Sequence, residues 1–155
     1  MGNTTRSILA DRFAPFGTTI FTETYWTFDA VDEALLTRWS LIRDARDATN
    51  KAIETVRTAG GVGSSLQAEV VVSAPPELHA VLQSLGDDLK FVLITSSAGL
   101  APAASLSVEV KPSAATKCER CWHYRADVGS DPAHPTICGR CTSNLHGSGE
   151  IRRVA

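Results

Sequence analysis

The segments Cys118-Glu-Arg-Cys121 and Cys138-Gly-Arg-Cys141 contain all four cysteines of this 155-residue chain, and sixteen residues separate the two pairs. A Cys-x-x-Cys turn can point both sulfurs at one ion, and two such turns complete a tetrahedron of thiolate ligands. The spacing therefore predicts a structural site for one Zn²⁺ per chain, with Gly139 as the small residue that allows the second turn. Because all four ligands are cysteines, no position is left for water, and we expect no catalytic role for the metal.

Other uses of the four cysteines stay open at this point. Two disulfides, a redox pair or an iron site held by sulfur are alternatives, and His123 and His134 are nearby candidates to replace a cysteine as ligand. A disulfide framework usually spreads its cysteines over the fold and follows a secretory signal. Here the four lie within residues 118–141, and residues 1–17 contain no long apolar run. We therefore expect a cytoplasmic protein without signal peptide or membrane span.

Upstream of the cysteines, the pattern of apolar residues predicts one long helix over residues 29–59. Its apolar stripe consists of Leu35, Trp39, Ile42, Ala45, Ala52, Ile53 and Val56. Asp29 or Asp32 is placed to cap the start, and Gly60-Gly61 supplies a left-handed stop. One helix cannot bury such a stripe alone, and we find no second long amphipathic helix in the chain. Partner helices are therefore expected outside it.

Between this helix and the cysteines, shorter patterns predict a small α+β unit. Ser73 followed by Pro75-Pro76 predicts the start of a short helix, which Gly86 ends. The apolar face of that helix consists of Leu78, Val81, Leu82 and Leu85. Strands are expected at residues 66–72, 89–94 and 106–110, with a further extended segment at residues 20–26. The Ala-, Pro- and Ser-rich segments 98–105 and 112–116 are expected to be flexible connections.

Charge is distributed unevenly along the chain. Residues 1–110 hold 8 Lys/Arg against 13 Asp/Glu, whereas residues 111–155 hold 7 against 4. A zinc ion with four thiolates carries a net charge of about −2, which part of the nearby basic charge offsets. The cations next to the ligands in sequence are Lys117, Arg120, Arg125 and Arg140. The basic end therefore favours an accessory contact with RNA over a stand-alone site of high affinity.

Several motifs resemble the C-terminal zinc finger of bacterial isoleucyl-tRNA synthetases. The most specific is the run Lys117-Cys-Glu-Arg-Cys-Trp-His-Tyr-Arg125. Supporting motifs are Asp127-Val-Gly129, His134-Pro135, Ile137-Cys-Gly-Arg-Cys141, Ser143-Asn144 and the ending Gly149-Glu-Ile-Arg-Arg-Val-Ala155. Farther upstream, Asn50-Lys51, residues 63–70 and residues 85–95 are similar to the end of the anticodon-binding region and the junction domain of that family. The resemblance covers roughly residues 19–155.

The resemblance implies an enzyme that activates isoleucine with ATP and transfers it to tRNA. No segment here matches the family's His-Ile-Gly-His or Lys-Met-Ser-Lys-Ser signatures. We therefore expect a monomeric fragment without catalytic residues, with ATP and Mg²⁺ bound only in the missing catalytic domain. The domains expected are a loose arm (1–17), the end of the anticodon-binding helical region (18–62), an α+β junction domain (63–112) and the zinc finger (113–155).

Within this fragment, we expect basic and aromatic side chains of the finger to contact isoleucine-specific tRNA. Trp122 and Tyr124 are suited to stacking on bases or ribose. The candidate phosphate contacts are Arg125, Arg140, Arg152 and Arg153, with Lys117 as a further cation. As alternatives, Trp122 covers the zinc site and Arg152 and Arg153 are plain solvated charges at a chain end.

Two other functions are weighed against this one. A free-standing zinc-finger protein would bind nucleic acid or a protein partner without catalysis. DNA glycosylases of the formamidopyrimidine class end in a similar four-cysteine finger, but they need an N-terminal Pro followed by an acid. This chain starts Met1-Gly2-Asn3, which disfavours the glycosylase.

Overall fold

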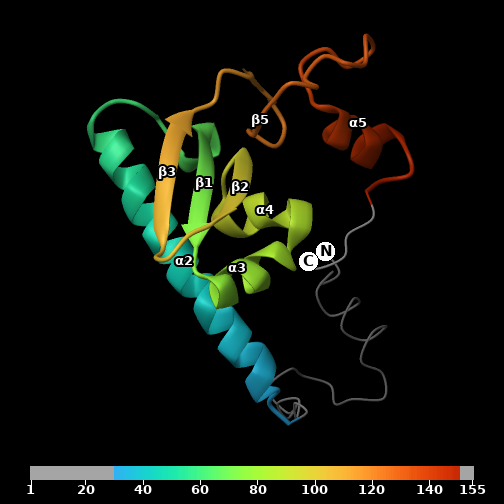
Figure 1. Ribbon diagram of the computed structural model, residues 1–155. Coiled ribbons are helices and arrows are strands. Elements are labelled where there is room, and N and C mark those ends of the chain that lie inside the picture. The colour runs from blue at the N-terminus through green and yellow to red at the C-terminus, as the bar shows by residue number, and fades with distance from the viewer. Residues whose placement is uncertain (1–29, 151–155) are drawn as a thin grey trace, which may run out of the picture. The chain divides into compact units, whose positions relative to one another are not determined.

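The computed structural model describes residues 30–150, so the expected arm, the extended segment at 20–26, Arg152 and Arg153 lie outside the described residues. Helix α2 spans Glu33–Thr58, as predicted, and ends at the predicted glycines (Figure 1). Gly60 has a φ of 79°, and its N–H donates to the Arg57 carbonyl at 3.0 Å. The Gly61 N–H donates to the Val56 carbonyl at 2.9 Å. These two bonds form a Schellman motif, which satisfies carbonyls left over at the helix end.

Only part of the predicted apolar stripe of α2 is buried. Ile42, Ala45 and Ile53 belong to the hydrophobic core, and the Thr49 hydroxyl donates to the Ala45 carbonyl at 2.8 Å. Nearer the start of the helix, the side chains of Leu35, Leu36 and Trp39 are exposed. This end of α2 extends beyond the sheet in Figure 1. The predicted stripe thus contributes to the hydrophobic core from Ile42 onward.

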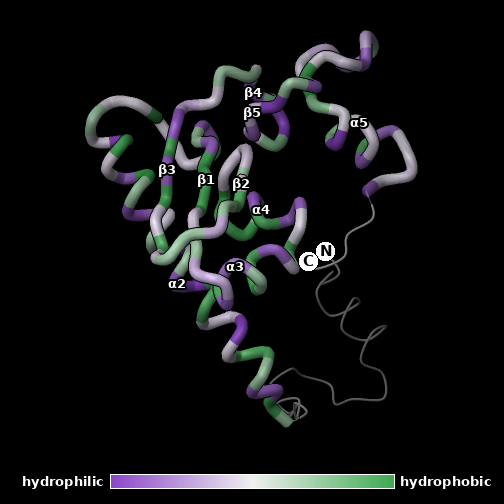
Figure 2. The backbone as a smooth tube through the Cα atoms, in the orientation of Figure 1, coloured by the Kyte–Doolittle hydropathy of each residue, from purple (hydrophilic) through white to green (hydrophobic). Residues whose placement is uncertain are grey.

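A three-stranded sheet packs on α2, with strand order β2-β1-β3. Strand β1 (Ala68–Ala74) pairs with β2 (Ser97–Pro102) in parallel and with β3 (Ser107–Pro112) in the antiparallel sense. Alternate residues of β1 are buried, so one face of the strand joins the core. Figure 2 shows hydrophobic residues along β1, β2 and α4. The predicted strands 66–72 and 106–110 are thus confirmed, with small shifts of their ends.

Helix α3 spans Pro76–Gln83, as the proline signal predicts, and its residues Leu78 and Leu82 are buried. Gly86 has a φ of 52°, a conformation that favours glycine, and it starts a 3₁₀ turn (Gly86–Asp88). That turn leads directly into a further short helix, α4, which spans Leu89–Leu93.

The strand predicted at residues 89–94 is wrong, because this segment is α4. Leu89 and Leu93 are buried at a spacing of four residues, which is the period of a helix face. A short apolar run is compatible with a helix or with a strand, and this one forms a helix. Ile94 then ends the helix in the left-handed conformation, with a φ of 57°.

The flexible connection predicted at residues 98–105 is also wrong over most of its length, because β2 lies there. Its sequence, Ser-Ala-Gly-Leu-Ala-Pro, has low strand propensity. The strand forms through its pairing with β1, where Gly99 lies opposite Val71. A Cβ added to Gly99 would lie 3.4 Å from the Val71 side chain, so small residues suit this packing.

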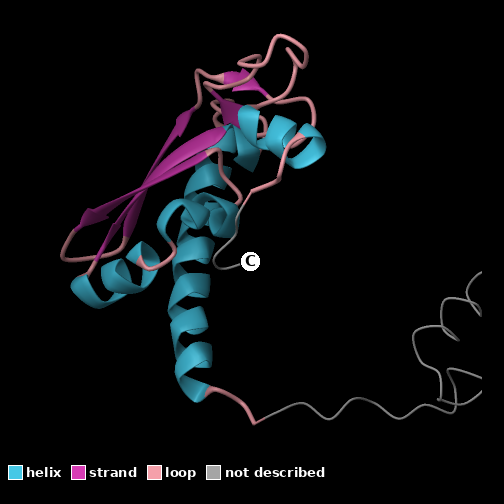
Figure 3. Cartoon of the chain, turned by 90° about the vertical axis from the view of Figure 1, so that its right-hand side faces the viewer, coloured by secondary structure: helices cyan, strands magenta, loops and turns pink. Residues whose placement is uncertain are grey.

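The segment 112–116 is more ordered than predicted. Ser113 donates its N–H to the Gln67 carbonyl at 2.8 Å and its hydroxyl to Glu69 at 2.7 Å. The finger follows, with strand β4 (Thr116–Lys117) antiparallel to β5 (Tyr124–Arg125), and then helix α5 (Gly139–His146). Figure 3 shows these helices and strands together, and the predicted α+β class is confirmed. Within residues 30–150, no helix has the length and apolar character needed to cross a bilayer.

Candidate metal centre

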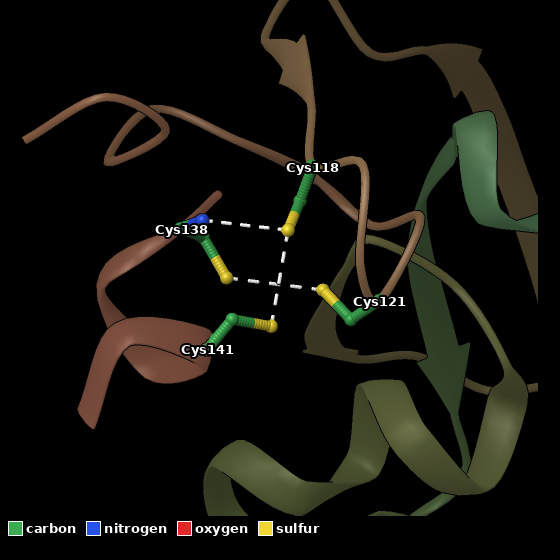
Figure 4. A group of neighbouring side chains, drawn as sticks. All are labelled: Cys118, Cys121, Cys138 and Cys141. Carbon is green, nitrogen blue, oxygen red and sulfur yellow. Dashed lines mark hydrogen bonds between the residues drawn. The ribbon is translucent and has the colours of Figure 1, made fainter. Parts of the chain in front are cut away.

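The four cysteine sulfurs converge on one point. All four Sγ atoms lie within 4.8 Å of one another, and the Cys118–Cys141 and Cys121–Cys138 pairs are each 3.8 Å apart (Figure 4). A tetrahedral zinc with Zn–S bonds of about 2.3 Å requires sulfurs about 3.8 Å apart. A disulfide requires about 2.05 Å, and none of the four cysteines is bonded to another. The donor set and its dimensions suit one structural zinc ion.

Each Cys-x-x-Cys turn is positioned by an adjacent secondary-structure element, β4 for the first turn and α5 for the second. Cys118 follows β4, and its carbonyl accepts the Trp122 N–H at 2.9 Å. Cys138 caps the N-terminus of α5, and Cys141 lies in the first turn of that helix. The Cys138 N–H donates to Cys118 Sγ at 3.3 Å, and this bond links the two turns.

A glycine suits position 139 because its backbone lies very close to Asp127. The sequence had suggested a different reason, namely that a small residue allows the Cys-x-x-Cys turn. Its N–H donates to Asp127 Oδ2 at 3.1 Å, and a Cβ at this position would lie 3.0 Å from the same oxygen. Asp127 also accepts two bonds from Arg125, at 2.8 and 3.1 Å. The carboxylate therefore connects β5 to the start of α5, between the two halves of the metal centre.

Without a cation, the pKa values of Cys118, Cys121 and Cys138 are shifted in different directions. Burial raises the pKa of Cys118, but backbone amides of Cys121, Cys138 and Arg120 outweigh it and lower that pKa to about 6. Burial, with the neighbouring sulfurs, raises the pKa of Cys121 to about 12. Burial likewise raises the pKa of Cys138. A divalent cation must therefore displace protons to bind here, as thiolate sites require.

The apolar cover of the sulfurs comes from Val128 and Ile137, while Cys118, Cys138 and Cys141 are fully buried. Trp122 is 60% exposed and has a φ of 65°, a left-handed conformation that is rare for a bulky residue. Its ring lies 5.5 Å from the Lys117 ammonium. The indole thus faces solvent beside a cation, in contrast to the alternative in which it covers the metal.

Two of the arginines expected on the RNA surface are held by carboxylates. Arg125 pairs with Asp127, and Arg140 donates two bonds to Glu150, at 2.6 and 2.8 Å. The Arg140 side chain is only 18% exposed. Hydrogen bonding to Glu150 raises the pKa of Arg140, which stays charged. The sequence identified both cations but gave no sign of the Arg140 partner, because Glu150 is ten residues away, whereas Asp127 is only two residues from Arg125.

The histidines considered as alternative ligands lie outside the sulfur cluster. His123 Nδ1 is 3.2 Å from the Cys121 carbonyl, and the pKa of His123 is lowered mainly by burial. His134 stacks on His146 with ring centroids 3.8 Å apart. Tyr124, a predicted stacking residue, is half-buried in β5, and its N–H donates to Ser96 Oγ at 2.6 Å.

Residues 116–144 match the family model described as a zinc finger found in FPG and IleRS. Isoleucine–tRNA ligase of Paraburkholderia xenovorans is 56% identical over 148 residues, which are 92% of this chain and 16% of that protein. The enzyme of Burkholderia cenocepacia is 54% identical over the same shares. That of Cupriavidus metallidurans is 55% identical over 142 residues, 88% of this chain and 15% of its own length. The chain thus matches the C-terminal region of bacterial isoleucine–tRNA ligases and spans only 15–16% of these relatives.

Proposed function

We propose that this chain is the tRNA-contacting C-terminal module of an isoleucine–tRNA ligase. The observation that carries the proposal is 54–56% identity to such ligases across both the sheet unit and the finger. The parent enzyme would join isoleucine to its tRNA with ATP, in the cytoplasm. Its catalytic domain would bind ATP and Mg²⁺, and this chain by itself would be inactive.

In this proposal, Cys118, Cys121, Cys138 and Cys141 hold one Zn²⁺ that orders the finger. A bound zinc would supply cross-linking of the two turns rather than chemistry, since four sulfurs fill its shell. The role suits a segment in which the fully buried side chains are cysteines. Small domains that lack a sufficient apolar core commonly rely on a metal in this way.

The RNA surface proposed here is centred on Trp122 and Lys117. An exposed indole beside an ammonium group suits a nucleotide, because the ring stacks on a base while the cation meets a phosphate. Tyr124 is half-buried and contributes less area to such a surface. Arg152 and Arg153 remain predicted phosphate contacts outside the described residues.

For Arg125 and Arg140 we propose a mainly structural role. Each guanidinium already bonds a carboxylate in bidentate fashion, which satisfies the geometry that a phosphate would otherwise use. An RNA phosphate would have to compete with that carboxylate. Replacing Arg125 or Arg140 should therefore destabilise the finger, and any effect on phosphate contacts should be mainly indirect.

The test is binding of the zinc-loaded chain to a transcript of isoleucine-specific tRNA. Trp122→Ala should weaken binding about tenfold, because stacking on one base contributes about 1–3 kcal/mol. Alanine keeps a Cβ, so the backbone constraint at φ 65° stays the same. The affinity falls with salt concentration, and the magnitude of the slope of log affinity against log salt counts the phosphate contacts. Lys117→Ala should reduce this magnitude by about one, and Arg152→Ala with Arg153→Ala should reduce it by about two.

Leu145→Ala is the matched control, because Leu145 is 49% exposed on α5 and contributes to neither hydrophobic cluster. It should leave binding unchanged. Equal binding of wild type and Trp122→Ala would remove the indole from the RNA surface. Preference for duplex DNA over the transcript would support a repair-type module in place of the ligase module.

A further inference from the structure

One aromatic ring contacts both halves of the metal centre. The Phe91 ring of α4 meets the His123 ring edge-on, with centroids 5.5 Å apart and planes at 77°. The Arg140 guanidinium lies over the same ring, 4.7 Å from its centroid. His123 comes two residues after Cys121, and Arg140 lies between Cys138 and Cys141. Each zinc turn therefore places one side chain against Phe91.

Phe91 belongs to neither hydrophobic cluster of the described residues. On the same helix, Leu89 and Leu93 are in the core of the sheet unit and Val92 packs against it. The sulfur cluster is covered by Val128 and Ile137. Phe91 is half-buried, and its ring contacts are with the finger and with Lys90, whose ammonium lies 5.2 Å from the centroid. This large side chain is thus placed for contact between the two regions.

A second contact lies just beyond α4. Ser96 Oγ accepts the Tyr124 N–H at 2.6 Å and itself donates to the Leu66 carbonyl, so one hydroxyl joins the finger to the sheet unit. The segment leading to Ser96 passes through Ile94, a β-branched residue in the left-handed conformation. Such a conformation is unfavourable for a β-branched residue and persists where the surroundings fix it.

We propose that Phe91 is a positioning residue that couples metal binding to the docking of the finger on α4. The two zinc turns are far apart in sequence, and a bound ion holds them at a fixed spacing. That spacing sets His123 and Arg140 on the same ring. With the ion lost, the two turns separate and the ring loses at least one of its two contacts, so the side of α4 that carries Phe91 loses its cover. The inference concerns metal binding and internal docking, and it stands whether or not the chain binds RNA.

Coupling of this kind is reciprocal. If the ion strengthens docking on Phe91 by some factor, an intact Phe91 strengthens metal binding by the same factor. This reciprocity gives two independent measurements, one on the metal and one on the helix.

The first measurement is the zinc affinity of the full chain, by competition with a chelator of known affinity under reducing conditions. Phe91→Ala should weaken zinc binding about tenfold, within the usual range of coupling between sites. Phe91→Tyr, which keeps the ring, should restore most of the affinity. Leu145→Ala removes a similar apolar side chain from the finger itself and should have no effect. Equal zinc affinity in wild type and Phe91→Ala would overturn the proposal.

The second measurement uses the wild type alone, so it decides the question even if Phe91→Ala fails to fold. Amide hydrogen exchange is compared between zinc-loaded and zinc-free protein. Residues Leu89–Leu93 of α4 should exchange at least tenfold faster without zinc, while the amides of β1 keep their protection. Unchanged exchange in α4, or an equal loss in α4 and β1, would contradict specific coupling through Phe91.

Discussion

The sheet unit and the finger of this protein are stabilised in different ways. Among residues 30–150, the sheet unit buries thirteen apolar side chains in one cluster drawn from α2, β1, α3, α4 and their connections. The finger buries three cysteines, with partial cover from Val128 and Ile137. A hydrophobic core forms from many small contributions and tolerates the loss of a few contacts. A metal centre concentrates its stabilisation in four bonds, so it should respond in an all-or-none manner.

The largest difference between the two regions should appear on loss of a ligand. Cys138→Ser should abolish tight zinc binding and unfold the finger, because binding of a structural zinc contributes about 10–16 kcal/mol in small fingers. The sheet unit should keep its helix and strand signals. Zinc content and amide exchange along the chain measure both effects.

Ser143→Ala, within the α5 helix that Cys138 precedes, is the control for Cys138→Ser and should keep the metal. Global unfolding on loss of the ligand would contradict the separation of the two regions.

The converse change removes a side chain from the sheet core. Leu82 is fully buried, and Leu82→Ala should destabilise the sheet unit by about 2–5 kcal/mol through lost burial and the cavity left behind. Thermal unfolding monitored by circular dichroism measures this loss. Leu145→Ala should cost less than about 0.5 kcal/mol, as is usual for an exposed position.

At saturating metal, Leu82→Ala should still give the absorption spectrum of four thiolates around Co²⁺. Loss of that spectrum would mean that the finger depends on the sheet core for its metal site.

The response to pH should also separate the regions. In the metal-free protein the pKa values of Cys121 and Cys138 are raised, so both thiols carry protons at neutral pH. Zinc uptake must release at least these two protons, so apparent affinity should rise by at least about 100-fold per pH unit near neutrality. Chelator competition at several pH values gives the slope. A slope close to zero would show that the thiols are already ionised without metal.

The smallest effects should come from two glycines, one in each region. Gly139→Ala places a Cβ 3.0 Å from Asp127 Oδ2, and we expect a loss of about 1 kcal/mol in the finger. Gly99→Ala in β2 meets the Val71 side chain at 3.4 Å and should be nearly neutral. Zinc affinity reports the first and thermal unfolding the second. A larger effect of Gly99→Ala than of Gly139→Ala would contradict the expectation that Gly139 is the more tightly packed of the two glycines.

Local patterns were sufficient for several features of the fold. The spacing of the cysteines predicted the sulfur cluster, because a Cys-x-x-Cys turn fixes two sulfurs over only four residues. The C-terminal end of α2 was predicted from Gly60, and the start of α3 was predicted from Pro76. The backbone preferences of both residues act within a single turn. Each Cys-x-x-Cys turn and each of these helix termini depends on residues close in the chain, so the sequence alone determined them. The meeting of the two turns joins segments sixteen residues apart, and only its chemistry, four thiols suited to one ion, indicated it in advance.

Other features were decided by residues far apart in the chain. The segment Ser97–Pro102 becomes a strand because β1 offers it hydrogen bonds, although its own residues have little preference for that conformation. Arg140 pairs with Glu150, ten residues away, and lies over Phe91 of α4. Pairing and docking depend on distances set by the whole fold, which no local pattern of residue types contains. The tertiary structure therefore decided which cations are held by carboxylates and which ring joins the two regions.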